Sequence, residues 1–326
     1  MFDWVDHLRL NASASTYLDQ GSNSLRSVAS HPVRVLRAEL RLRNEVRNLS
    51  GSTSLVSRQA SPFSNGNIER ALLSVAEHGV YDFDDALMHS PLSTSERLWS
   101  KRKTWRRSVE AADVVIAGND YLAAAAAEFN SNVVVIPSCV EPDQYVLKRN
   151  YELSDVPVAV WLGSPSTEHY LSGIAETLLT LHTSHGLRLK VISAGAASLG
   201  ELDHMVDRVE WTADGYQNEL AISDFGVMPL NDTAWTRGKC AYKLLQYGAA
   251  GLPMVGSRVG ANRAVLEASD GFAVLSAGEW HDAIFALINE SSERRTRRGA
   301  HGRAAIERDY SFAAWSPRWI QAMGLA

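Results

Sequence analysis

The sequence predicts an α/β protein made of two doubly wound, parallel-sheet domains that face each other. The main evidence is two runs in which short apolar segments alternate with amphipathic, helix-like segments. Such alternation is typical of parallel sheets covered by helices. The polar segment Lys148–Pro157 separates the two runs and is interpreted as a linker. The predicted domains therefore cover residues 1–150 and 157–309, and a closing helix covers residues 310–326.

Composition places the chain among globular proteins. It has 326 residues, of which 45% are hydrophobic and 21% charged, as in ordinary compact domains. The formal net charge of −5 argues against a nucleic-acid partner. No apolar run approaches the roughly 20 residues of a membrane span, and the N-terminus does not resemble a signal peptide. Cys139 and Cys240 form no disulfide framework or metal-ligand spacing. We therefore expect a cytoplasmic protein.

The first 70 residues carry the weakest pattern. Val33–Val46 has helical spacing with many arginines on one side, and Ser50–Asn67 indicates a loop or a weak strand. Open α/β domains usually begin with a buried strand and a Gly-rich turn, and none is recognised near Met1. The first strand of this domain is therefore expected to be missing or to lie upstream.

Clearer elements follow in both halves. In the first half we expect helices at Ile68–His78, Glu96–Ala112 and Asp120–Phe129. The expected strands are Gly79–Phe83, Asp113–Ala117 and Val133–Ile136. In the second half the alternation predicts elements at Val158–Leu162, Glu168–His182, Arg188–Ser193, Val206–Trp211, Asn218–Ile222, Phe225–Pro229, Lys239–Gly251, Pro253–Ser257, Ala261–Ala268, Phe272–Leu275, Ala277–Asn289, Ser292–Asp309 and Phe312–Met323.

The segment Lys239–Gly251 is a predicted helix with a basic start. Lys239, Lys243 and Gln246 fall on one helical face. A second face is expected to be buried and consists of Tyr242, Leu245 and Ala249. Arg237 and Gly238 precede the helix, whose free N–H groups and dipole would favour an anion such as phosphate. The alternative is an ordinary amphipathic helix with solvated lysines.

Four loops follow predicted strands, where open parallel sheets bind ligands. They are Asp84–His89, Gly163–Thr167, Asn231–Lys239 and Gly256–Asn262. Gly163, Ser164, Ser166 and Thr167 open a predicted helix and could surround a phosphate with N–H groups and hydroxyls. The hydroxyl residues there could equally be helix caps. Two loops that could each bind an anion lie in the same half of the chain. Together they favour a diphosphate ligand more strongly than one such loop would.

Three carboxylates cluster at the end of the predicted strand Gly79–Phe83. Asp82, Asp84 and Asp85 could hold a divalent metal, or they could act in acid–base or hydroxyl-orienting chemistry beside His89. The remaining alternative is a solvated turn with a helix cap. Two basic runs, Lys101–Arg107 and Glu293–Arg303, are interpreted as solvated helix faces. For Lys101–Arg107, contact with an anionic membrane surface stays open.

Several segments resemble the retaining glycosyltransferases of family 4. Thr236–Glu267 is similar to the donor-binding segment of that family, and Trp161–Leu171 to the loop that opens its C-terminal domain. The family's N-terminal strand ends are resembled by Tyr81–Ser90, Ala112–Ala123 and Val133–Tyr145, and its closing segment by Arg308–Trp315. The resemblance implies the two-Rossmann, GT-B-type fold with its last helix crossing back to the N-terminal domain. It also implies sugar transfer from a nucleotide sugar to a hydroxyl with retention and without a metal.

The resemblance also assigns roles to individual residues. Gly163, Ser164, Ser166 and Thr167 match the loop next to the donor diphosphate. Arg237, Gly238, Lys239 and Lys243 match the segment where basic residues neutralise the leaving group. Asp84, Asp85 and His89 match the loop that faces the transferred sugar and the acceptor, and are the expected catalytic residues. No metal or cofactor is expected. The donor would be a UDP-, GDP- or TDP-linked sugar and the acceptor a small molecule or glycan.

One departure from the family concerns its paired glutamates. Gln246 stands where the second glutamate commonly holds the donor ribose, and Gly238 stands where the first is expected. A neutral amide can still bond a ribose hydroxyl, but more weakly than a carboxylate. Two alternatives therefore remain, namely a non-catalytic nucleotide or sugar-phosphate binding module and a sugar-phosphate epimerase of the same shape. The sequence does not predict the oligomeric state.

Overall fold

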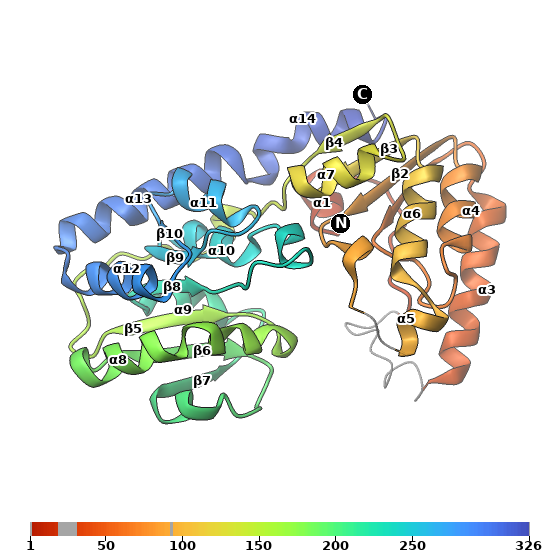
Figure 1. Ribbon diagram of the computed structural model, residues 1–326. Helices are drawn as coiled ribbons and strands as arrows, with labels where there is room; N and C mark the ends of the chain where they lie inside the picture. The colour runs from red at the N-terminus through yellow and green to blue at the C-terminus, as the bar shows by residue number, and fades with distance from the viewer. Residues whose placement is uncertain (1, 19–30, 92–93, 326) are drawn as a thin grey trace. The chain divides into compact units, whose positions relative to one another are not determined.

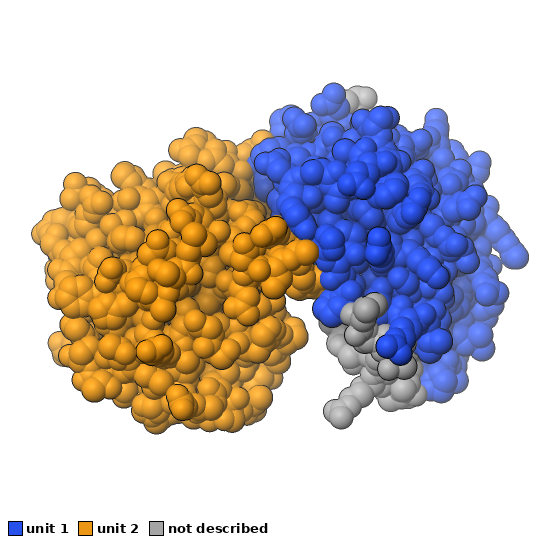
Figure 2. All heavy atoms as spheres, viewed as in Figure 1, with its two compact units in different colours: residues 1–137, 315–326 blue, residues 138–314 orange. Residues whose placement is uncertain are grey.

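The computed structural model describes residues 2–18, 31–91 and 94–325 and divides the chain into two compact units. Figure 2 shows the first, residues 1–137 and 315–326, in blue and the second, residues 138–314, in orange. The boundary lies earlier than the sequence predicts. Lys148 is buried in the second unit, where its Nζ donates to the Ser223 carbonyl at 2.7 Å. The segment Lys148–Pro157 is therefore part of a domain and not a linker.

The first unit is a parallel sheet with strand order β1-β2-β3-β4 and helices on its faces (Figure 1). Its strands are β1 Thr53–Ser57, β2 His78–Phe83, β3 Val114–Ala117 and β4 Val133–Val135. Its helices are α1 Phe2–His7, α3 Pro32–Asn48, α4 Asn67–Val75, the 3-10 turn η1 Leu87–His89, α5 Thr94–Leu98, α6 Lys101–Ala111 and α7 Asp120–Ala127. The alternation of buried strands and helices is as the sequence predicts.

The structure decides two details of this unit. For Ser50–Asn67 it confirms the strand of the two alternatives, since β1 lies there and pairs along its whole length with β2. The long helix expected over Glu96–Ala112 is two helices. They are separated at Ser100, whose side chain accepts a hydrogen bond from the Lys103 amide at 3.3 Å and so begins α6.

The end of the chain belongs to the first unit, as the fold class predicted. The helix α14 Phe312–Ala322 ends there. The Trp319 ring stacks on Trp4 with their centroids 5.2 Å apart. His78 Nε2 is 2.9 Å from the Ala322 carbonyl oxygen, within hydrogen-bonding distance. Among the described residues, no helix is long and apolar enough to cross a membrane.

The second unit is a parallel sheet with strand order β10-β9-β8-β5-β6-β7. Its strands are β5 Val158–Leu162, β6 Arg188–Ser193, β7 Val206–Glu210, β8 Phe225–Met228, β9 Met254–Ser257 and β10 Phe272–Val274. Its helical segments include the 3-10 segments η2 Pro142–Gln144, η3 Pro165–Ile174, η4 Gly200–Met205 and η5 Thr236–Gly238. The α-helices are α8 Ala175–His185, α9 Tyr216–Ile222, α10 Tyr242–Ala249, α11 Asn262–Ala268, α12 Ala277–Asn289 and α13 Ser292–Asp309. Buried aliphatic and aromatic side chains fill both faces of the sheet.

Two predicted helices of this unit begin later than expected. The helix expected from Glu168 opens instead as the 3-10 segment η3 and becomes α-helical only at Ala175. The helix expected from Lys239 begins at Tyr242, because Ala241 has a left-handed backbone with φ of +57°. Gly251, with φ of +69°, follows the end of this helix as predicted.

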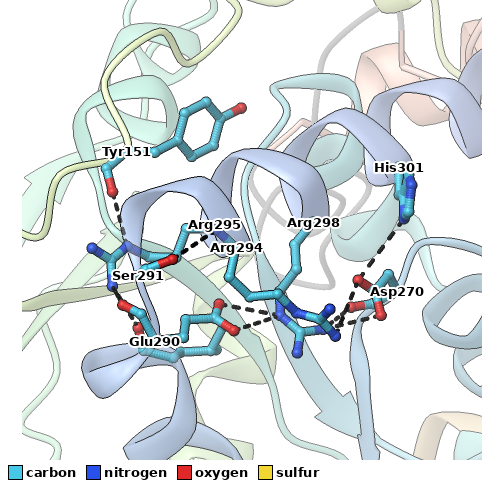
Figure 3. A network of polar contacts seen from close by, with 9 residues as sticks. Tyr151, Asp270, Glu290, Ser291, Arg294, Arg295, Arg298 and His301 are labelled. Carbon is cyan, nitrogen blue, oxygen red and sulfur yellow. Dashed lines mark hydrogen bonds and ion pairs between the residues drawn. The ribbon is translucent and has the colours of Figure 1, made fainter.

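The arginine-rich helix α13 is partly structural and not only a solvated face. Arg295 and Arg298 are 4% and 8% exposed. Figure 3 shows Arg295 donating to the Tyr151 carbonyl at 2.8 Å, and Arg298 bound to the carboxylate of Glu290 at 3.0 Å and to that of Asp270 at 3.2 Å. These bonds hold α13 to the end of α12 and to the turn after α11 and explain why buried guanidinium groups are tolerated there.

Candidate functional site

Strand order fixes where the second unit can bind a ligand. From the central strand β5, the chain proceeds through β6 and β7 in one direction and through β8, β9 and β10 in the other. The loops after β5 and β8 therefore leave in opposite directions. Open parallel sheets bind ligands beyond the carboxyl ends of strands at such a switch point, and this region is called the crevice below. The two strands pair only through Ala159 with Phe225 and Val160 with Gly226. They diverge beyond those pairs.

A buried tyrosine closes the gap between the diverging strands. The Tyr247 hydroxyl accepts a hydrogen bond from the Leu162 amide at 3.0 Å and donates to the Val227 carbonyl at 3.2 Å. It thereby satisfies one polar group of each strand beyond their last pair. Gly226 makes room for the ring, since a Cβ there would lie 2.4 Å from it. The Tyr247 side chain therefore forms a closely packed, hydrogen-bonded floor beneath the crevice.

Gly163 and Lys243 meet directly above this floor. A Cβ at Gly163 would lie 2.5 Å from the Trp161 ring and 2.7 Å from Lys243 Cε, so only glycine fits. The Lys243 ammonium lies over the Trp161 ring, 5.2 Å from its centroid. Burial, together with the charge of nearby Lys239, lowers the pKa of Lys243 to about 8. Within residues 2–18, 31–91 and 94–325, no carboxylate pairs with Lys243.

The three hydroxyl residues of the loop after β5 form one exposed turn. The Thr167 amide donates to the Ser164 carbonyl at 2.9 Å, and the Ser164 and Ser166 Oγ atoms are 3.0 Å apart. Because Gly163 precedes this turn and contacts Lys243, the structure brings the predicted anion loop after β5 beside helix α10. The turn continues into a 3-10 segment, so the expected α-helix dipole is absent at this point.

The loop after β8 holds Arg237 and Lys239 by internal bonds. Arg237 forms an ion pair with Asp232, with Nε to Oδ1 at 2.6 Å. The Lys239 ammonium lies 5.0 Å from the Trp235 ring centroid. Gly260, with φ of +54°, packs against this loop, since a Cβ there would lie 2.5 Å from the Arg237 carbonyl. Lys239 precedes α10 and therefore does not share its helical face with Lys243 and Gln246, which corrects the sequence analysis.

Gln246 faces a group of aromatic residues that the sequence did not single out. It is 8% exposed, and its side chain interacts with the Tyr145 hydroxyl. That hydroxyl is 3.4 Å from the Tyr216 hydroxyl, and the Tyr216 ring stacks on Trp211 with centroids 6.0 Å apart. Trp211 directly follows β7 and is 45% exposed, so a flat apolar ring is presented beyond a strand end. Tyr242, expected to be buried, is 47% exposed.

A buried ion pair ties the strand-end loops together. Glu168, 4% exposed, accepts from Arg208 Nη2 at 3.1 Å, and Arg208 Nη1 donates to the Gly195 carbonyl at 3.0 Å. Glu168 lies just after the loop of β5, Gly195 lies in the loop of β6, and Arg208 is in β7. The pair therefore fixes two loops of the crevice relative to the sheet. The sequence offered no signal for it beyond two charges far apart in the chain.

The predicted catalytic carboxylates lie in the first unit and share one guanidinium. Arg58, which follows β1 with φ of +55°, forms a bidentate ion pair with Asp84 and contacts Asp85 Oδ2 at 3.3 Å. Burial, and then the charge of Asp84, raises the pKa of Asp82 to about 6. His89 is exposed in η1, with its ring centroid 6.2 Å from that of Tyr121. The sequence analysis did not single out Arg58, which the structure places against the predicted carboxylates.

Comparison with known proteins supports the fold. No family model and no curated protein matches the sequence. HepE of Anabaena, solved in complex with UDP and glucose, matches with a TM-score of 0.68 and 13% identity over 100% of this chain and 89% of that one. WaaG, a glycosyltransferase involved in lipopolysaccharide biosynthesis, matches with a TM-score of 0.65 and 13% identity over 94% and 86% of the two chains. TarM matches with a TM-score of 0.61 and 12% identity over 82% of this chain, which spans 54% of TarM. The chain thus has the two-domain GT-B fold of these structures.

Proposed function

We propose that this protein transfers a sugar from a nucleoside-diphosphate sugar to a hydroxyl of a small-molecule or glycan acceptor, with retention and without a metal. The observation that carries the proposal is Lys243. It is a partly buried cation with a lowered pKa at the switch point of an open parallel sheet, and no described carboxylate pairs with it. A diphosphate placed against Gly163 would supply the missing negative charge.

The remaining groups of the crevice fit the rest of such a donor. Ser164, Ser166 and Thr167 offer hydroxyls to phosphate oxygens, while Arg237 and Lys239 add cationic charge. The exposed Trp211 ring offers a stacking surface for a base, and Gln246 a neutral partner for ribose. As the glycosidic bond breaks, negative charge grows on the leaving diphosphate, and preorganised cations stabilise that charge selectively.

The proposal assigns acceptor chemistry to the first unit. Asp84 and Asp85, oriented by Arg58, would position the acceptor hydroxyl, and His89 would bind hydroxyls of the transferred sugar. With retention, the leaving phosphate itself can take the acceptor proton on the same face of the sugar. Among related solved structures, HepE was crystallised with UDP and glucose, which makes UDP-sugars the first donors to test.

Thermal unfolding with UDP, GDP, TDP and ADP, each with and without EDTA, tests the donor site. A ligand at 100 times its dissociation constant stabilises a protein by about 2.7 kcal/mol, which shifts the melting temperature by several degrees. We expect one nucleotide to do so regardless of EDTA. Lys239→Ala and Arg237→Ala should each lower turnover by about 10²- to 10³-fold. Arg188→Ala is the matched control because Arg188 begins β6 at the amino end of the parallel strands, and the crevice lies beyond their carboxyl ends.

One observation favours a second candidate, a binding module without catalysis. Asp84 and Asp85 are both engaged by Arg58, so neither is a simple solvent-facing base. Incubation with the nucleotide sugar alone separates the two candidates, because a transferase slowly hydrolyses its donor and a pure binder does not. An epimerised nucleotide sugar as the only product would contradict both. NMR of the anomeric proton in the glycoside product decides between retention and inversion.

A further inference from the structure

Helix α3 of the first unit carries an apolar strip on its outward face. Val33, Leu36 and Leu40 follow the spacing i, i+3, i+7 and are 62%, 61% and 51% exposed. Residues at that spacing lie on one side of a helix. Figure 1 shows α3 alongside α4, and α4 in turn packs against α6, so α3 is the outer helix of this layer. Three large aliphatic side chains in a row on an outer helix indicate a contact surface.

The inward face of α3 makes the contacts that hold this helix to the rest of the first unit. Ala38 and Leu42 are buried where α3 meets α4. Glu39 accepts hydrogen bonds from the Tyr17 hydroxyl at 2.8 Å and from Ser61 Oγ at 2.6 Å. The second acid of the helix, Glu45, lies 3.8 Å from the guanidinium of Arg41. Both acidic side chains of α3 are thus used within the protein, and the outward strip is not needed for this packing.

Arginines border the apolar strip. At 100° per residue, Arg37 and Arg43 lie about 60° to either side of its centre, and Arg47 continues its line. All three are exposed, and they form no ion pair among the residues that the structure describes. The outward face therefore combines a narrow apolar centre with a cationic border, although the whole chain has a net charge of −5.

We propose that the outward face of α3 binds the surface of an anionic lipid membrane. Leucine and valine side chains on such a helix enter the acyl boundary while arginines stay at the headgroups, with their long stems beside the apolar centre. Charge complementarity favours this partner over a second copy of the chain. In a symmetric dimer through this face, the arginine borders would oppose each other. The proposal rests on α3 alone and is independent of the sugar-transfer function.

Flotation of the full chain with vesicles tests the proposal. The probes are vesicles of phosphatidylcholine alone and vesicles with about 30% phosphatidylglycerol, at low and at high salt. We expect binding to the anionic vesicles only, with weaker binding at high salt. The double variant Arg37→Gln/Arg43→Gln should bind about 30-fold more weakly, since each basic residue at an anionic surface contributes about 1 kcal/mol. The double variant Leu36→Ser/Leu40→Ser should bind the anionic vesicles at least tenfold more weakly.

Matched controls use equally exposed side chains of the second unit. Ile222 and Leu275 are 64% and 57% exposed, and the Arg263 and Arg308 side chains are 66% and 65% exposed. The doubles Ile222→Ser/Leu275→Ser and Arg263→Gln/Arg308→Gln should bind as the wild type does. Melting temperatures of all variants identify any loss through unfolding. Absence of wild-type binding at low salt, or equal binding by the α3 and control variants, overturns the proposal. A wild-type dimer that the leucine variant abolishes, without vesicle binding, would assign the face to a second copy.

Discussion

Replacing Lys243 by methionine should make the unliganded protein more stable and weaken its binding of nucleotide. The difference between a pKa of 10.5 in the unfolded chain and about 8 in the folded one corresponds to about 3 kcal/mol. This is the upper limit of what the ammonium costs the folded state, because the side chain keeps some contact with water. Methionine preserves the packing against Trp161 and Gly163 without the charge, although it loses the cation–π contact. We expect a gain of about 1–3 kcal/mol, or about 2–4 °C in melting temperature for each kcal/mol.

The same substitution should remove a pH dependence. In the wild type, unfolding takes up a proton at Lys243 between pH 8 and 10.5, so the stability of the unliganded protein rises with pH through this window. A bound diphosphate favours the charged ammonium, so nucleotide affinity should be constant below pH 8 and fall by up to tenfold per pH unit above it. In Lys243→Met, neither the stability of the unliganded protein nor the nucleotide affinity should show this pH dependence.

Calorimetric titration of nucleotide and thermal unfolding from pH 6.5 to 10 measure these effects together. A charge-assisted contact to phosphate is worth about 1.5–3 kcal/mol, so the variant should bind about 10- to 150-fold more weakly. Arg188→Met, at the amino end of the parallel strands, is the control for loss of one cation. If Lys243→Met melts below the wild type and binds nucleotide with unchanged affinity, Lys243 is a structural residue and the donor site lies elsewhere.

Three further substitutions test the framework of the crevice. Gly163→Ala should destabilise by about 1–3 kcal/mol through overpacking and displace Lys243, so that nucleotide no longer raises the melting temperature. Tyr247→Phe leaves the Leu162 amide and the Val227 carbonyl without the partner that the Tyr247 hydroxyl provides. It should lower the free energy of unfolding, measured in urea, by about 2–4 kcal/mol; an unchanged midpoint would contradict the role of that hydroxyl. Glu168→Gln leaves the half-buried guanidinium of Arg208 without its carboxylate and should destabilise by about 1–3 kcal/mol, with hydrogen exchange accelerated first in the loop after β6.

The sequence predicts those parts of this fold whose apolar runs are short and unambiguous. β5 and β6 and the helices α12 and α13 begin and end where the alternation places them. A four- to six-residue apolar run bounded by polar turns has little alternative to a buried strand. The placement of Gly163 and of Arg237 in loops after the carboxyl ends of two strands also follows, because the alternation locates where each strand ends.

Features set by tertiary contacts escaped the sequence. The periodicity of Lys239–Gly251 continues smoothly through Ala241, yet this alanine is left-handed and α10 begins after it. No local propensity favours positive φ at alanine, so packing of the surrounding loop imposes it. Arg58 lies in a Ser-rich stretch without periodicity, and its meeting with Asp84 depends on the parallel pairing of β1 with β2. A single sequence does not specify which strands pair.

The buried and half-buried cations of the second unit show why the candidate site differs from a structural charge network. Arg208, Arg295 and Arg298 each bind carboxylate or carbonyl oxygens of the protein, so their charges are compensated within the fold. Among the residues that the structure describes, Lys243 lies against an aromatic ring and near a second cation and pairs with no carboxylate, and burial beside that cation lowers its pKa. A folded chain gains nothing from such an uncompensated charge, because a methionine would pack as well. Its presence at the switch point is best explained by an anion that arrives as ligand, and it links the stability of the unliganded protein to the affinity for its donor.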